Sequence, residues 1–127
     1  MILSLFIVMV SLLLIHEMDA VRTKEWKMFI ILKDMEDEQA YRLFVIAHLP
    51  LYFSVLFIMI QGGAQANEIL FYLIDLFIVG HSFIHYAFRK KVNNGFTSFF
   101  SKALIYGLGF LAVTHLFLLL LINTAAV

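Results

Sequence analysis

The chain has 127 residues, of which 63% are hydrophobic and 14% are charged, and its formal net charge is zero. Soluble domains carry about 25% charged residues, so a water-soluble protein of this length could not cover so much apolar surface. Cysteine is absent, which excludes disulfides, thiolate metal ligands and a thiol nucleophile. We therefore expect an all-α protein in contact with the lipid bilayer, with no nucleic-acid partner, whose chemistry lies in the membrane or at its edge.

Four stretches are apolar enough to cross a bilayer, which takes about 20 residues each. They cover approximately residues 1–21, 41–60, 68–88 and 102–122. The first lacks a preceding basic residue and a cleavage pattern, so we expect a retained span and not a signal peptide. Gly62 and Gly63 are expected to end the second helix, and Asn67 to cap the third. Because the connections are short, residues 1–127 are expected to form a single four-helix transmembrane domain.

All nine basic residues lie in or beside the first and third connections. They are Arg22, Lys24, Lys27, Lys33 and Arg42 in the first group, and Arg89, Lys90, Lys91 and Lys102 in the second. The second connection and both ends of the chain have none. The positive-inside rule therefore predicts that the two basic connections are cytoplasmic and that both termini are outside, in a bacterial inner membrane.

The segment Lys24–Lys33 of the first connection combines a tryptophan and apolar residues with three lysines. This composition predicts a short helix that lies in the membrane interface between the first two spans.

Pro50 interrupts the second span two residues after His48. Proline lacks the backbone N–H that would bond the carbonyl of Ile46, so we expect a kink at this point. The proline is either tolerated without further consequence or directs His48 and leaves a carbonyl free for another partner.

Five histidines lie in the predicted spans, where an ionisable side chain costs about 2.5–3.5 kcal/mol. Depth in the membrane follows from the distance along each helix to the basic residue at its cytoplasmic end, at about 1.5 Å per residue. Four histidines fall in one layer at a depth of roughly 6–12 Å. They are His16, His48, His81 and His85. Three helices are therefore expected to bring four imidazoles to one buried polar site.

The fifth histidine, His115, falls deeper, at roughly 20 Å from the basic end of its helix. Asp75 on the third span reaches a similar depth, roughly 21 Å. A pair between Asp75 and His115 across the third and fourth helices would satisfy both groups.

The histidine layer predicts a divalent metal site, because imidazole and carboxylate are ligands of zinc and of non-haem iron. His81 and His85 are four residues apart and so share one helix face, as two ligands of one metal do. The predicted ligands are His16, His48, His81 and His85. Glu17 and Asp19, next to His16, are the predicted catalytic residues, acting as a ligand or as a general base. This pattern favours a metal-dependent enzyme that acts on a lipid or another apolar substrate, by hydrolysis or by oxidation.

Two alternatives use the same residues differently. Two of the histidines could be axial ligands of a haem b in an electron-transfer subunit, with Gly107 and Gly109 leaving room for the macrocycle or, instead, for a close helix. The other alternative is a non-catalytic interaction or transport protein, which relies on a homo-oligomer or a larger membrane complex and on protonation of its histidines.

The run Leu13–Arg22, which contains His16-Glu17-Met18-Asp19-Ala20, resembles the opening of an uncharacterised bacterial family of four-span membrane proteins with a His-Glu-Leu/Met-Asp-Ala signature. The run Ala47–Leu51 and the His81-x-x-x-His85 pair fit the same pattern. The chain is also loosely similar to the HXXEE family, although Asp19 and Ala20 stand where that motif has two glutamates. These resemblances imply the four-span topology and imply no reaction.

Overall fold

The computed structural model describes residues 2–61, 68–91 and 94–125, and every regular element in these ranges is a helix. The elements are α1 (Ile2–Arg22), the 3-10 helix η1 (Glu25–Met28), α2 (Asp37–Ala47), α3 (Leu49–Gln61), α4 (Glu68–Phe88) and α5 (Phe99–Ala125). The predicted all-α class is confirmed. The short helix expected over Lys24–Lys33 is reduced to the four-residue 3-10 helix η1, and residues 29–35 after it form bends and turns. The helix caps expected at Gly62, Gly63 and Asn67 lie outside the described residues.

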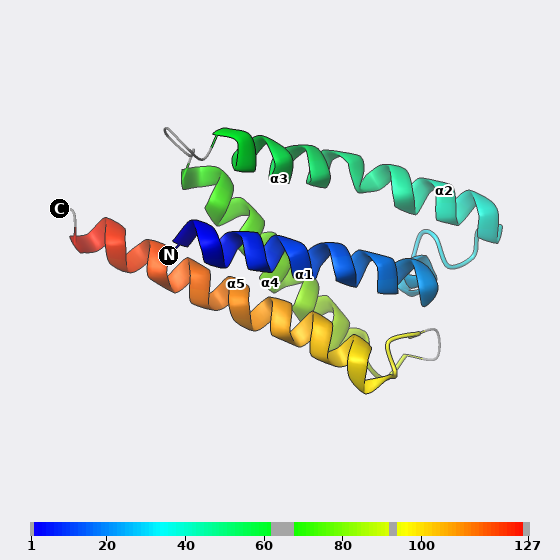
Figure 1. The fold of residues 1–127 in the computed structure, drawn as a ribbon. Coiled ribbons are helices and arrows are strands. Elements are labelled where there is room, and N and C mark those ends of the chain that lie inside the picture. The colour runs from blue at the N-terminus through cyan, green and yellow to red at the C-terminus, as the bar shows by residue number, and fades with distance from the viewer. Residues whose placement is uncertain (1, 62–67, 92–93, 126–127) are drawn as a thin grey trace.

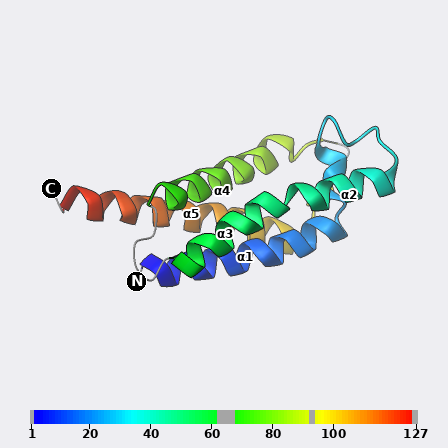
Figure 2. The same cartoon turned by 90° about the horizontal axis from the view of Figure 1, so that it is seen from above.

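Within the part of the chain that the structure describes, four helical segments are long and apolar enough to cross a membrane. They are Ile2–Arg22, Asp37–Ile60, Ile69–Phe88 and Phe99–Thr124. Figures 1 and 2 show that they run up and down, with both termini at one end of the bundle. The connections on either side of η1 and between α4 and α5 lie at the opposite end, so all the basic residues gather there (Figure 1).

Helix α5 packs along both α1 and α4, and it lies close to α4 at Gly109. A Cβ at Gly109 would lie 2.7 Å from the Ser82 hydroxyl oxygen, whereas a Cβ at Gly107 would meet nothing within 4 Å. The Ser82 hydroxyl donates a buried hydrogen bond to the Ile105 carbonyl, at 2.9 Å. Of the two glycines on this helix, Gly109 is therefore the one that permits close helix packing.

Two apolar clusters lie on either side of the histidine layer, one toward each end of the bundle. The larger one fills the end of the bundle near the termini and includes the fully buried Phe6 and Ile78. The smaller one lies at the end that carries the connections, where Trp26 and Phe96 pack with Phe44. Outside these clusters, exposed apolar side chains cover the helices, as suits contact with lipid.

The expected kink in the second span is a one-residue interruption of the helix at His48, between α2 and α3. The His48 backbone N–H bonds the carbonyl of Val45 at 3.2 Å, one residue short of the α-helical partner. The carbonyl of Phe44 instead accepts a hydrogen bond from Nδ1 of the His48 ring, at 2.6 Å. The break near Pro50 therefore orients the His48 side chain.

We predict that Gly109→Ala destabilises the bundle by about 1–3 kcal/mol, because the added methyl overlaps Ser82. Thermal unfolding of the purified protein measures the effect. Gly107→Ala is the matched control and should leave the melting temperature unchanged or raise it. Adding Ser82→Gly should restore part of the stability that Gly109→Ala removes. Equal melting temperatures for Gly109→Ala and Gly107→Ala would contradict this packing.

Candidate metal centre

Glu25 reaches the histidine layer because the chain reverses directly after α1. Lys24 adopts the left-handed conformation, with φ 54° and ψ 53°, which ends the helix and turns η1 back against it. A lysine in this region costs about 1–2 kcal/mol relative to the ordinary helical conformation. The turn places the Glu25 side chain at 3% exposure, beneath the end of α1.

Asp37, the first residue of α2, stabilises this turn through three side chains. Its carboxylate accepts hydrogen bonds from Lys24 Nζ at 2.6 Å and from Trp26 Nε1 at 3.0 Å, and Lys27 Nζ lies 3.0 Å away. Both lysines therefore face Asp37 and leave the inward face of η1 to Glu25.

The carboxylate of Glu25 meets three imidazoles from α1 and α4. Among the described residues, His16, Glu25, His81 and His85 form the group that could hold a metal ion, and one ligand atom from each lies within 4.8 Å of the others. Nε2 of His16 is 2.9 Å from Nε2 of His81, and Nε2 of His85 is 3.2 Å from Glu25 Oε1. The distances to Glu25 oxygens are 3.6 Å from His81 and 3.7 Å from His16.

These distances suit a metal ion. A tetrahedral ion with bonds of about 2.0–2.1 Å separates its ligand atoms by about 3.4 Å. The distances from His16 to His81 and from His85 and His81 to Glu25 Oε1 are 2.9, 3.2 and 3.6 Å and lie near that value, and all the ligand atoms of the group lie within 4.8 Å of one another, so the side chains have to draw together slightly around an ion. The donor set of three imidazole nitrogens and one carboxylate oxygen fits zinc and non-haem iron alike.

Phe96 covers one side of the group. Phe96 packs against His85 with ring centroids 4.4 Å apart and against His16 at 5.4 Å. Three side-chain atoms of the group are buried without a hydrogen-bond partner, namely His16 Nδ1, His85 Nδ1 and Glu25 Oε2. An unpaired buried carboxylate oxygen is costly, and coordination to a cation would satisfy it.

Burial by itself would raise the pKa of Glu25. A hydrogen bond from His85 and charge interactions with His81, His85 and His16 outweigh burial, so the pKa of the Glu25 carboxyl lies below its usual value. Glu25 is therefore an anion, which is the form that binds metal.

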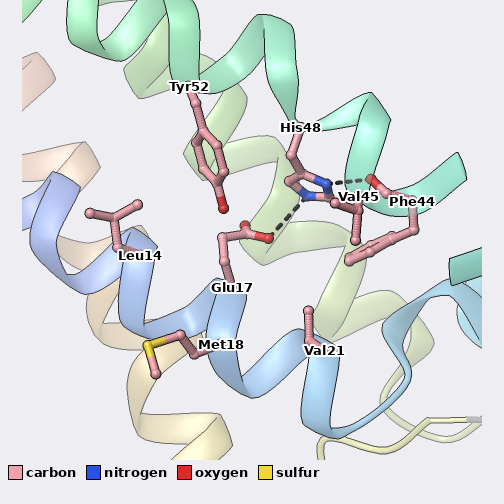
Figure 3. Close-up of a pocket in the computed structure, with 8 residues that line it drawn as sticks. All are labelled: Leu14, Glu17, Met18, Val21, Phe44, Val45, His48 and Tyr52. Carbon is pink, nitrogen blue, oxygen red and sulfur yellow. Dashed lines mark hydrogen bonds and ion pairs between the residues drawn. The ribbon is translucent and has the colours of Figure 1, made fainter. Parts of the chain in front are cut away.

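His48 lies outside the group of four and pairs with Glu17 instead. Its Nε2 is 3.0 Å from Glu17 Oε2, and its Nδ1 must carry hydrogen because it bonds the Phe44 carbonyl. Figure 3 shows this pair in a pocket of about 340 Å³ between α1 and the α2–α3 break, with the Tyr52 hydroxyl pointing toward the same carboxylate.

Asp19 also faces away from the group of four. Its Oδ1 accepts hydrogen bonds from Arg22, at 2.9 Å from Nε and 2.7 Å from Nη2. Of the two predicted catalytic residues, the structure thus places Glu17 beside His48 and Asp19 beside Arg22.

The predicted pair between Asp75 and His115 is present in the structure. His115 Nδ1 lies 2.8 Å from Asp75 Oδ2, and both side chains are fully buried between α4 and α5. The rings of Phe6 and Phe71 flank His115. This pair satisfies one polar atom of each residue inside the larger apolar cluster.

The structure brings three of the four predicted histidines together and adds Glu25, which sequence reasoning missed. Glu25 belongs to a polar connection, where acids are ordinary. The one indication in the sequence that Glu25 is buried is its position next to Trp26. A tryptophan in so short a segment is expected to be buried, and Trp26 is.

A family model described as a family of unknown function, DUF6713, matches residues 2–122. The chain belongs to this family. No curated protein and no solved structure matches the chain. Membership of DUF6713 agrees with the expected uncharacterised family.

A second cavity of this DUF6713 protein, of about 700 Å³, lies between α3 and α4. Glu25, His81 and His48 line it, so the cavity borders both the group of four and the Glu17–His48 pair. His48 lines both cavities.

We predict that His81→Ala weakens zinc binding by about 100-fold or more, because it removes one of four ligand atoms. His48→Ala is the matched control and should change the dissociation constant by less than about threefold, since His48 lies outside the group. Competition with a chromophoric chelator measures both constants. An equal loss in the two variants would mean that His48 is a ligand after all.

Proposed function

We propose that this protein binds a divalent metal through His16, Glu25, His81 and His85, and that it is a metal-dependent membrane enzyme whose substrate is a lipid or another apolar molecule. The observation that carries the proposal is the convergence of three imidazole Nε2 atoms and one carboxylate within 4.8 Å, inside an otherwise apolar bundle.

Hydrogen bonding alone satisfies this group poorly. If the imidazoles carry hydrogen on Nδ1, three nitrogen lone pairs and an anion face one another. If they carry it on Nε2, the Nδ1 atoms of His16 and His85 are buried acceptors without a donor. A cation accepts all four ligand lone pairs at once and so offsets the cost of burying the carboxylate and the facing nitrogens, while Nδ1 of His16 and of His85 stay without a hydrogen-bond partner.

The residues around the group have distinct roles in this proposal. A bound metal would supply a Lewis acid, and water or a substrate oxygen would have to join the four protein ligands in order to be activated. Glu25 would neutralise part of its charge, and Phe96 excludes water from its covered side. His48 lines the larger cavity, while its Nδ1 is held by the Phe44 carbonyl and its Nε2 by Glu17, so Glu17 is the group with which it can exchange a proton.

The haem alternative is less well supported by the geometry. The rings of His16, His81 and His85 contact one another, with centroids 4.8–5.3 Å apart. A haem has to lie between two axial imidazoles, and these contacts leave no room for the macrocycle between any two of the three.

We predict that the purified protein contains about one equivalent of zinc or iron per chain and shows no Soret absorption band. Glu25→Gln should lower the metal content severalfold, because a neutral amide is a poor ligand. Glu36→Gln, an exposed acid in the same connection, is the matched control and should keep the full metal content. A metal-free wild-type protein, or a Soret band, would refute the proposal.

We further propose that the end of the bundle with the basic connections faces the cytoplasm of a bacterium and that the termini face outward. Because the chain has no cysteine, single cysteines can report the topology. In intact cells, an impermeant maleimide should label Thr124→Cys and should label Asp34→Cys and Thr97→Cys only after permeabilisation. The opposite labelling pattern would mean that the proposed topology is inverted, and it would not bear on the metal proposal.

A further inference from the structure

The cavity of about 700 Å³ between α3 and α4 has a polar end and an apolar remainder. Its polar end is lined by Glu25, His48 and His81. Ser54, farther along α3, also lines it, but its hydroxyl already donates to the Pro50 carbonyl at 2.8 Å. All other lining residues are apolar or glycine. A ligand that fits this distribution is an amphiphile with one small polar head and an apolar tail.

The cavity follows the helix axis for much of the membrane. On α4 the lining extends from Leu70 to Ile84, which are fourteen residues apart and hence roughly 21 Å. An extended alkyl chain advances about 1.25 Å per carbon, given C–C bonds of about 1.5 Å. About 17 carbons therefore match the length of the whole lining, and about 13 carbons match the part of it from His81 to Leu70.

The volume leads to the same size of ligand. At about 30 Å³ for each water-sized group, 700 Å³ accommodates on the order of twenty heavy atoms. A single-chain lipid has about that many, whereas a two-chain phospholipid has more than twice as many.

The cavity can be entered from the bilayer. Leu73 and Phe77 both line it and remain 56% and 46% exposed on a membrane-spanning helix. Because lipid tails are as apolar as this lining, the hydrophobic effect does not draw a chain in from the membrane. Selection therefore depends on the head group and on the space available.

We infer that the ligand of this cavity is a single-chain lipid with a small oxygen-bearing head, such as a long-chain fatty acid or alcohol. Its head lies against His81 and Glu25, and its chain runs along α4 toward Leu70. The inference rests on the proposed metal site, since a divalent ion beside one carboxylate leaves a net positive charge that favours an oxygen head and disfavours an ammonium head.

The test uses the full chain in phospholipid nanodiscs and two photoreactive palmitic acid analogues. A diazirine near the carboxyl end should crosslink to residues around Gly80 and Ile84, and one near the methyl end to residues around Leu70 and Leu73. Palmitate and palmityl alcohol should compete with crosslinking, and palmitylamine should not. Reversed or scattered crosslinks, or equal competition by the amine, would overturn the inference.

Gly80 offers a variant that alters only the cavity. A Cβ at Gly80 meets nothing within 4 Å, and the residue lines the cavity beside His81, so the side chain of Gly80→Leu starts in open space and is expected to occupy part of the cavity. We expect it to weaken binding of the palmitic acid probe by about tenfold. Gly107→Leu, which also has open space but lies outside the lining, is the matched control and should bind as the wild type does. An unchanged affinity in Gly80→Leu would contradict the inference.

Metal content, measured on the same samples, separates the two proposals. It should be equal in the wild type, Gly80→Leu and Gly107→Leu. If the protein is metal-free yet orders the two probes along α4 and loses affinity in Gly80→Leu, the metal proposal fails and the assignment of the chain cavity stands. If metal is bound and Gly80→Leu has no effect, the cavity assignment fails alone.

Discussion

Glu25 connects three segments of this chain inside a bundle that otherwise has mostly apolar side chains in contact. Helices in a bilayer gain little from burying apolar surface against one another, because lipid tails are equally apolar. Their arrangement depends more strongly on packing and on polar contacts. The carboxylate of Glu25 faces His16 on α1 and both His81 and His85 on α4, so one side chain of a short connection joins two helices that both pack chiefly against α5.

The same constraint accounts for the other ionisable side chains in the spans. Glu17 pairs with His48, Asp19 with Arg22, and Asp75 with His115. Two of these pairs join different helices, and each would cost several kcal/mol if it were left unpaired in hydrocarbon. Close packing at Gly109 adds a steric contact between α4 and α5. The polar pairs and the close helix contact at Gly109 thus fix how the helices are arranged, and the apolar clusters fill the space between these contacts.

The break at His48 relates this arrangement to the proposed function. Had α2 continued into α3 without interruption, the Phe44 carbonyl would accept a backbone N–H, and the His48 ring would lose that partner. The break lets His48 turn toward Glu17 while it still borders the cavity between α3 and α4. The residue that looked like a fourth ligand thus lies at the wall of the cavity where we place the substrate.

Several features of this protein follow from the sequence alone. Hydropathy defines four spans, and helical rise places His16, His81 and His85 at one depth and Asp75 level with His115, because these depend only on local regularity. The sequence could not distinguish His48 from Glu25 as the fourth member of the site. That choice depends on a left-handed turn at Lys24 and a helix break at His48, which move one side chain into the layer and direct the other away. Depth along a helix is local, whereas the direction in which a side chain points across a bundle is decided only when the helices and connections pack together.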